Sequence, residues 1–438
     1  MTAGEVRVPR ARLLVAAAAA VVVAVLLAAT RGYTFYFDEW TFISSMPDWT
    51  LSSYFVPHNE HPSILFRALY SALMHTVGLR AYWPYVTVLL LAHAANALLL
   101  FELIRRRAGE LVGFAAALLL LVLGAGWEDL LWAFQIAWLL SIALGLGALL
   151  LLASPRAVVP VVILLTASLA FSGIGVIFVV AVGVQLLLSP GRRRQVLWLL
   201  PLGAALLAWL SVFGQYGHHP NPQPTAANIP LTPLYALWGM GEGVAGIIGE
   251  GGWFGPPLLL AAVAALAWRW KRHGLDPLAA GVAAGMVAFY LVLGLTRAQL
   301  GLQQGGASRY EYVGAVLWLI LLGSAASGLP WRGTWRPALL ACLFLACFSS
   351  AVLFYSFAIA RPVVMERQVA DFYALAAERG DPCLNPDASV DLLVMPAITR
   401  PRLYYRAVDE FGDPRDGLAL RDQASYRAAL ANLRQAGC

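Results

Sequence analysis

The sequence predicts an all-α polytopic membrane protein with about eleven transmembrane helices. Of its 438 residues, 60% are hydrophobic and only 12% are charged, whereas about a quarter of the residues in a soluble domain are charged. Apolar blocks recur from residue 13 to residue 357, and a polar tail follows them. We therefore expect one transmembrane domain over residues 1–357 and an extracytoplasmic C-terminal tail over residues 358–438.

The predicted spans follow one another with short connections. The first apolar block lacks a clear small-residue cleavage site, so we expect a retained signal anchor. Several blocks are shorter than the roughly 20 residues that a perpendicular helix needs, and the block pair 157–188 is compatible with two spans or with a re-entrant hairpin. The predicted spans are 13–30, 84–104, 111–126, 132–153, 157–172, 173–188, 196–213, 256–270, 278–296, 313–329 and 336–357.

The block from Ser63 to Gly78 determines the predicted topology. Its polar residues recur every four positions, which indicates a helix lying at the membrane interface rather than a span. Fifteen basic residues then fall in the cytoplasmic segments and five in the outer loops, as the positive-inside rule requires. We expect a multi-pass protein of the bacterial plasma membrane, with the N-terminus in the cytoplasm and the C-terminus outside. The outer five are Arg31, Arg67, Arg80, Arg297 and Arg309.

Three outer segments are long enough to carry function. The first loop covers residues 31–83, and the late loop, 214–255, is rich first in proline and then in glycine. The tail has helical pattern at Glu366–Arg379 and Ser425–Gln435 and a short predicted strand at Val390–Val394, so we expect a small α/β tail. Outside the cytoplasm, Cys383 and Cys438 can form a disulfide bond.

Adjacent acidic residues, Asp38 and Glu39, follow the first span within an aromatic stretch. A solvated interfacial turn would explain them. Alternatively, they are catalytic carboxylates at the mouth of a membrane cavity, as a base or as metal ligands. Because the two charges are alike, we expect the pKa of one of them to be raised. Glu128 and Asp129 form a second acidic pair, in the next outer loop, and either share that cavity or are simple loop charges.

A further polar group precedes the interfacial helix, in the stretch His58-Asn59-Glu60-His61-Pro62. His58, Glu60 and His61 are candidates for binding a polar substrate, and two histidines with a glutamate could instead hold a metal together with Asp38. Asn59 is a candidate N-cap for the helix.

Basic residues are scarce in the outer loops, and Arg297 and Arg309 open and close one of them. Each either reaches toward lipid phosphate from a helix end or forms a fork that holds a substrate phosphate. Tyr310 follows directly, and we include it among the substrate-binding candidates. His218 and His219, beside the proline run, are weaker candidates.

The chain resembles the GT-C glycosyltransferases, which are polytopic enzymes that use polyprenyl-phosphate sugars. The resemblance covers residues 1 to about 330 and rests on the order and sidedness of short motifs. It implies that Asp38 acts as the base and that Arg309, which belongs to a late Arg-Tyr pair, lies near the donor phosphate. The motifs are Phe37-Asp38-Glu39-Trp40, His58-Asn59-Glu60-His61-Pro62, Leu79 to Arg107, and Ser308-Arg309-Tyr310.

A strict DxD motif is absent, so a divalent metal, Mg²⁺ or Mn²⁺, remains an open prediction, with Asp38, Glu128 and His61 as its candidate ligands. An enzyme acting outside the cytoplasm cannot reach nucleotide sugars, so we expect a lipid-linked donor. One base and cationic assistance to the departing phosphate would suffice for inverting transfer to a cell-envelope glycan, lipid or protein.

Two other classes of protein remain open. A glycan polymerase or ligase would depend on basic residues of a late outer loop. A transporter or flippase of lipid-linked sugars would need polar groups within the spans, where Asn96, Gln135 and Gln185 are sparse. Nucleic acid is not an expected partner, because the net charge of +6 is spread over short loops.

Overall fold

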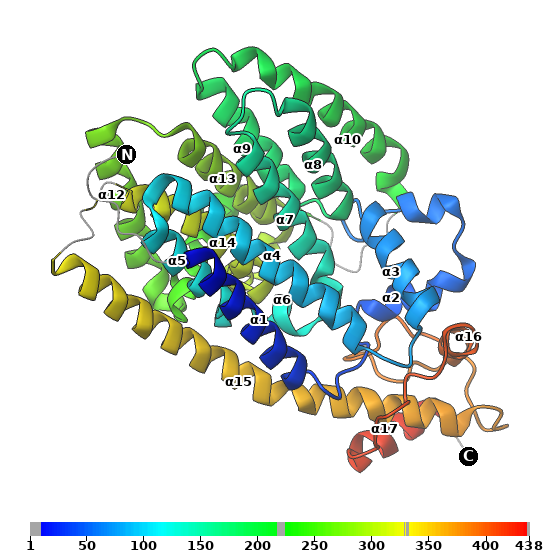
Figure 1. Cartoon of the computed structure of the whole chain (residues 1–438). Helices are drawn as coiled ribbons and strands as arrows, with labels where there is room; N and C mark the ends of the chain where they lie inside the picture. Colours follow the sequence, from blue (N-terminus) through cyan, green and yellow to red (C-terminus); the bar gives the residue numbers. More distant parts are fainter. Residues whose placement is uncertain (1–9, 217–223, 328, 330–332, 436–438) are drawn as a thin grey trace.

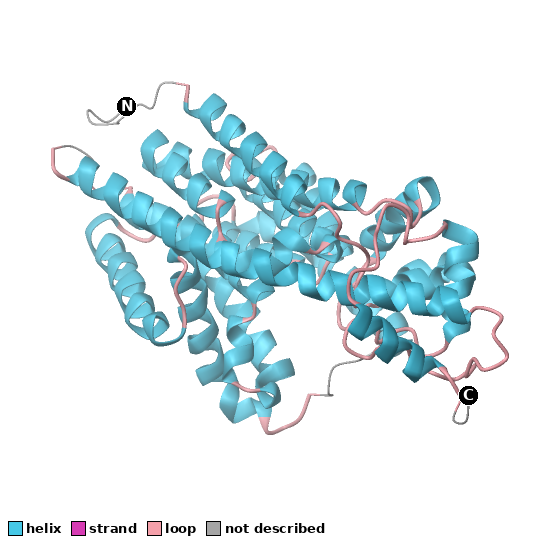
Figure 2. Ribbon diagram, turned by 90° about the horizontal axis from the view of Figure 1, so that it is seen from below, coloured by secondary structure: helices cyan, strands magenta, loops and turns pink. Residues whose placement is uncertain are grey.

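The computed structural model describes residues 10–216, 224–327, 329 and 333–435. Among these residues the secondary structure is helical and no strand occurs (Figure 2). The predicted strand at Val390–Val394 is therefore wrong, because this segment forms turns. One reason is local: the Asp391 side chain accepts a hydrogen bond from the Leu393 N–H at 2.7 Å, which offers the backbone an alternative to a strand.

Apolar helices form the main bundle (Figure 1). Six helical segments of the described chain are long and apolar enough to cross a membrane, or eight if each of two bent pairs is one span. The helices are α1 (Ala11–Ala29), α4 (Trp83–Ala108), α5 (Glu110–Leu121), α6 (Trp127–Leu131), α7 (Ile136–Leu151), α8 (Val158–Phe171), α9 (Gly175–Leu188), α10 (Leu200–Phe213), α11 (Asn228–Ala245), α12 (Gly255–His273), α13 (Pro277–Arg297), α14 (Ser308–Ala326) and the first part of α15 (Trp335–Glu378).

The chain is thus a multi-pass membrane protein by its helices, while the count of eleven spans stays a prediction. Helices α8 and α9 have 14 residues each, about 21 Å at 1.5 Å per residue, which is shorter than a hydrocarbon core of about 30 Å. They turn at Ser172, so either two tilted spans or a re-entrant hairpin returns the chain to the same side of the bundle.

Small residues let the bundle helices approach closely. A Cβ atom at Gly281 of α13 would lie 2.3 Å from the Ala181 carbonyl oxygen of α9, and one at Gly285 would lie 2.6 Å from the Ile177 carbonyl oxygen. These two glycines share one face of α13, four residues apart, and that face is the one packed on α9.

The predicted late loop, 214–255, contains a helix that we did not expect, α11. Its first residue, Asn228, donates a side-chain hydrogen bond to the Leu295 carbonyl at 2.8 Å, near the end of α13. Just beyond its last turn, Gly246 packs against Glu311 at the start of α14. Both ends of α11 therefore lie at the end of the bundle where α13 ends and α14 begins. The chain then bends by 104° into α12.

The remaining helices gather at this same end of the bundle, and α15 projects toward them (Figure 1). Helix α15 continues for 44 residues, so the last predicted span and the first tail helix are one element. The second predicted tail helix is confirmed as α17. These helices are α2 (Glu39–Ser45), α3 (Ile64–Val77), α16 (Pro401–Phe411) and α17 (Gln423–Leu433).

Helix α3 occupies the block predicted to lie at the interface. Three residues of its polar stripe, Ser63, Arg67 and Ser71, face the protein and are buried, whereas His75 is exposed. Arg67 donates to the Val56 carbonyl at 3.1 Å and lies 4.4 Å above the Phe42 ring. The stripe therefore fixes α3 to the first loop.

Candidate functional site

One cavity of about 500 Å³ opens at the end of the bundle, between the first loop, α6, α7 and the loop before α14. Seven of the residues predicted from the sequence to be catalytic or substrate-binding line it, although they come from segments far apart in the chain. These seven are Asp38, His58, His61, Glu128, Arg297, Arg309 and Tyr310.

Asp38 lies at the start of α2, in a loop of unusual backbone geometry. Phe37 has φ 56°, the left-handed region that side chains other than glycine seldom adopt. The Phe37 N–H donates to the Val394 carbonyl of the tail at 2.9 Å, which holds this conformation. The tail thus supports the loop that directs Asp38 toward the cavity. The Asp38 carboxylate lies 4.0 Å from Nε2 of His58, and 24% of its side chain is exposed.

Glu39 points away from the cavity, although the sequence suggested a catalytic role for it beside Asp38. Its side chain is completely buried. Its carboxyl group accepts hydrogen bonds from the Tyr36 N–H at 2.9 Å, the Tyr70 hydroxyl at 3.0 Å and the Tyr82 hydroxyl at 3.2 Å. The Tyr82 oxygen in turn accepts from the Ala133 N–H at 3.0 Å. Glu39 is therefore a positioning residue, whose hydrogen bonds connect the first loop, α3 and the residue before α4.

The titration of Glu39 follows from this burial. Desolvation raises the pKa of Glu39 from 4.5 to about 8, and the hydrogen bonds from Tyr36, Tyr70 and Tyr82 oppose this effect. A raised pKa in the acidic pair was expected from repulsion by Asp38. The physical cause is instead removal of the carboxyl group from water.

His58 and His61 lie at the two ends of a tight turn. Each donates its N–H to the other's carbonyl, at 3.1 and 3.0 Å, and Asn59 between them has φ 51°. Asparagine tolerates this conformation, so it serves the turn. The predicted N-cap role of Asn59 is wrong, because Ser63 is the N-cap residue of α3.

The His61 ring packs closely against the turn between α8 and α9. A Cβ atom at Gly173 would lie 2.6 Å from Nδ1 of His61, so only glycine leaves this room. Burial lowers the pKa of His61 to about 4, with the positive charges of Arg297 and Arg309 acting in the same direction. At neutral pH His61 is therefore a neutral hydrogen-bonding group at the cavity.

Both predicted phosphate-binding arginines already face a carboxylate. Arg297 pairs with Glu60 at 3.0 Å, and its own side chain is 9% exposed. Glu60 is absent from the cavity lining and acts through this pair. Arg309 pairs with Glu128 at 3.3 Å, and both of these line the cavity. The lining therefore carries both signs of charge, with Asp38 and Glu128 as acidic groups and Arg297 and Arg309 as basic groups.

Arg361 of α15 is a residue that the sequence analysis missed. It is 7% exposed, its Nε atom is buried without a hydrogen-bond partner, and no carboxylate among the described residues pairs with it. The guanidinium lies 3.9 Å above the ring of Tyr36, which lines the cavity. Its position four residues beyond the last predicted span was the available sequence signal, but its contact with Tyr36 follows only from the packing of α15.

Several polar atoms at the cavity wall are buried and have no hydrogen-bond partner in the described part of the chain. They belong to His58 (Nε2), Asn59 (Oδ1), Trp132 (Nε1), Gln135 (Oε1) and Tyr310 (hydroxyl). Buried polar groups in native structures are nearly always paired. This cavity therefore suits a ligand that offers many hydrogen-bonding groups.

Aromatic rings complete the wall. Trp132 stacks with Phe134 at 5.5 Å between centroids, and Trp138 stacks with Tyr310 at 5.9 Å. All four rings line the cavity. Rings of this kind offer flat apolar faces beside polar groups, which is the combination that a sugar ring fits.

The second member of the Glu128–Asp129 pair lies outside the cavity lining. Asp129 is completely buried, and neither of its carboxylate oxygens has a hydrogen-bond partner within the described residues. The described residues also contain no group of three His, Cys, Asp or Glu side chains that fits a metal ion. We therefore derive no step through a metal, and the prediction of Mg²⁺ or Mn²⁺ stays open.

The remaining candidates are placed only in part. His218 and His219 lie outside the described residues. Cys383 is disulfide-bonded, while Cys438 lies outside the described residues, so their pairing stays a prediction. In comparisons with known proteins, no family model, no curated protein and no solved structure matches the chain.

Proposed function

We propose that this protein is a membrane glycosyltransferase that transfers a sugar from a polyprenyl-phosphate donor to an extracytoplasmic acceptor, with inversion. The observation that carries the proposal is that Asp38, Arg297 and Arg309 line a single cavity with aromatic walls and unpartnered polar atoms. The proposal includes eleven spans in the bacterial plasma membrane, with the N-terminus in the cytoplasm and the site outside.

The cavity wall supports a sugar as the group transferred. The stacked pairs Trp132–Phe134 and Trp138–Tyr310 supply flat faces for the ring. The unpartnered groups of Gln135 and Asn59 supply an acceptor for hydroxyl protons, and the Trp132 N–H supplies a donor. A ligand without hydroxyl groups would leave these atoms unsatisfied.

Asp38 supports the base role. It is more exposed than Glu39 and lines the cavity, where its carboxylate can accept the proton of an acceptor hydroxyl. As that oxygen bonds to the anomeric carbon, the bond from this carbon to the phosphate oxygen breaks. Polyprenyl phosphate leaves with the electron pair, so no general acid is needed. Nε2 of His58 lies 4.0 Å from this carboxylate, beyond hydrogen-bond distance.

The cationic groups support a phosphate at one side of the cavity. Arg309 is shared with Glu128, so its fork is only partly free to bind a phosphate. Arg361 adds a positive charge that no described carboxylate neutralises, directly behind Tyr36. Because a charge in a poorly solvated site acts strongly on its surroundings, Arg361 favours an anion on the other side of that ring.

The experiment is incubation of the purified protein with a panel of radiolabelled polyprenyl-phosphate sugars, with release of polyprenyl phosphate as the readout. Asp38→Asn should lose a factor of about 100 to 10,000 in rate. The control is Asp48→Asn in the same loop, because Asp48 is 67% exposed and its pair with Arg406 at 2.5 Å is a surface contact. Protein levels and folding must match between the variants.

Near-normal turnover in Asp38→Asn would remove the base from this residue, and Glu128 would be tested next. If neither carboxylate mattered, the glycosyltransferase proposal would fail. A transporter or flippase would move labelled lipid without releasing phosphate. A polymerase or ligase would release lipid phosphate but depend on His218 and His219 instead of Asp38.

A further inference from the structure

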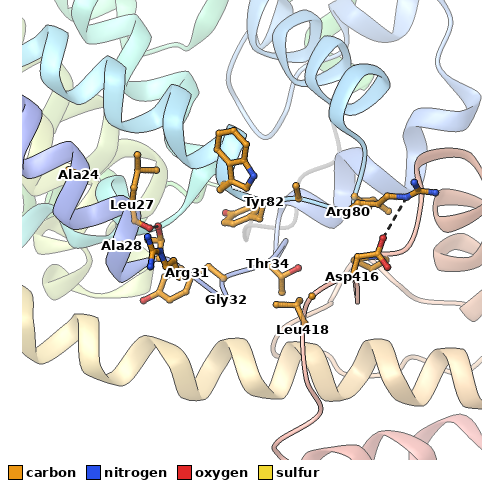
Figure 3. A pocket seen from close by; sticks show the side chains of 17 residues that line it. Ala24, Leu27, Ala28, Arg31, Gly32, Thr34, Arg80, Tyr82, Asp416 and Leu418 are labelled. Carbon is orange, nitrogen blue, oxygen red and sulfur yellow. Dashed lines mark hydrogen bonds and ion pairs between the residues drawn. The ribbon is translucent and has the colours of Figure 1, made fainter.

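A second depression, of about 650 Å³, lies away from the candidate site, where two spans meet the outer segments (Figure 3). We call it the α1–α4 groove. Its walls are the end of α1, the segment Thr30–Thr34, the segment Leu79–Trp83 at the start of α4, and the tail loop around Asp416. No described residue lines both the groove and the cavity, and the hydroxyl of Tyr82, a groove residue, donates to the buried Glu39 carboxyl group at 3.2 Å.

The groove is apolar toward the bundle and basic at its rim. Ala24, Leu27 and Ala28 of α1 form the apolar part, and both alanines are on the exposed face of this candidate span. Arg31 and Arg80 lie on either side of the opening (Figure 3). This order, apolar surface along a span followed by cations at its end, matches the order of acyl chain and phosphate in a lipid.

The charges of the groove are incompletely neutralised. Arg80 lies 3.7 Å from Asp416, and both of these side chains are more than half exposed, so the contact is weak. Arg31 is exposed and has no carboxylate partner among the described residues. One acidic group therefore faces two guanidinium groups in the lining, and the groove carries a net positive charge.

Aromatic residues place the opening at the level of a membrane surface. Trp83 is 67% exposed at the first turn of α4, and Tyr33 and Tyr82 line the same groove. Tryptophan and tyrosine concentrate where lipid headgroups meet the hydrocarbon layer. The two arginines thus lie at headgroup height beside the outward face of α1.

We propose that the α1–α4 groove binds an anionic phospholipid, with its phosphate and headgroup between Arg31 and Arg80 and an acyl chain along α1. The occupant is a bilayer phospholipid rather than the polyprenyl donor, because the groove shares none of its described lining residues with the candidate site. The inference rests on the membrane location and is independent of the proposed transfer reaction.

The test measures lipids retained by the full-length protein in native mass spectra, after titration of detergent micelles with dioleoyl-phosphatidylglycerol or dioleoyl-phosphatidylcholine. The wild type should retain the anionic lipid preferentially. Each of Arg31→Gln and Arg80→Gln should weaken its binding about fivefold, and the double variant about 25-fold. Arg402→Gln, an exposed arginine of α16 outside the groove, is the matched control and should bind as the wild type does.

Asp416→Asn provides a test in the opposite direction. It removes the one carboxylate that contacts Arg80 within the described residues and should tighten binding of phosphatidylglycerol. The gain should be selective for phosphatidylglycerol, whereas apolar surface exposed in a damaged protein would bind both phospholipids. Ala28→Trp should block the acyl-chain side and weaken binding without a change in charge.

Three outcomes would overturn the inference. The first is equal retention of both phospholipids by the wild type, and the second is unchanged binding in the double arginine variant. The third is displacement of phosphatidylglycerol by an equimolar amount of polyprenyl phosphate in the wild type but not in the double variant, which would give the groove to the donor lipid.

Discussion

Replacement of Glu39 by glutamine tests whether the buried Glu39 carboxyl group is protonated in the folded protein. Between pH 4.5 and about 8 the folded protein keeps the Glu39 proton, while the unfolded chain has released it. Folding therefore takes up a proton, and rising pH lowers the free energy of unfolding across this window. The slope approaches about 1.4 kcal/mol per pH unit, on the order of 5 kcal/mol over the whole window.

Glutamine resembles the neutral acid and does not titrate, so Glu39→Gln should lose this dependence. The measurement is thermal unfolding in detergent, followed by tryptophan fluorescence from pH 5 to pH 9. We expect the Tm of the wild type to fall relative to that of Glu39→Gln as the pH rises, and to stop falling above about pH 8. Glu410→Gln, at an exposed position of α16, should follow the wild type. A constant difference in Tm across this range would refute a protonated, buried Glu39.

Four further outcomes are expected. Arg309→Lys keeps the charge but loses the fork, so it should raise the KM for the lipid-linked donor about tenfold, measured by initial rates. Arg361→Gln should raise the KM for the donor by a similar factor and leave kcat unchanged. Initial rates at varied donor concentration give KM and kcat separately. Mass mapping without reductant should find Cys383 joined to Cys438, and a free Cys438 thiol would contradict this. A cysteine placed at Gly109 should resist an impermeant thiol reagent in intact cells, and labelling there would reverse the proposed topology.

The composition of the chain was enough to predict its class. Recurring apolar blocks in a chain with 60% hydrophobic residues favour a membrane over water, and in lipid helices satisfy the backbone of such blocks. The apolar blocks accordingly coincide with helices. The polar stripe from Ser63 to His75 likewise predicted a separate helix, and α3 occupies Ile64–Val77.

Local pattern was less informative where proline and glycine are frequent. The stretch before α12 was interpreted as a loop, yet Asn228–Ala245 is helical. The glycines of α11 weaken its helix propensity, but they permit close packing: a Cβ atom at Gly239 would lie 2.5 Å from the Tyr290 ring. Packing against α13 and α14 therefore outweighs the local preference. In the tail a local side-chain contact matters instead. The Asp391 carboxylate accepts from the Leu393 N–H, and the segment predicted as a strand forms turns.

The sequence by itself determined that this is a helical membrane protein, and it predicted that the candidate acidic, histidine and arginine residues of the site lie on one side of the membrane. Only the tertiary structure decided their roles. It separates the neighbours Asp38 and Glu39, one on a cavity and one among three hydrogen-bond donors. It pairs Arg297 and Arg309 with carboxylates and, within the described part of the chain, leaves Arg361 without one. The physical reason is that burial and pairing depend on distances between segments far apart in the chain, such as the 181 positions between Glu128 and Arg309, and no local pattern records those distances.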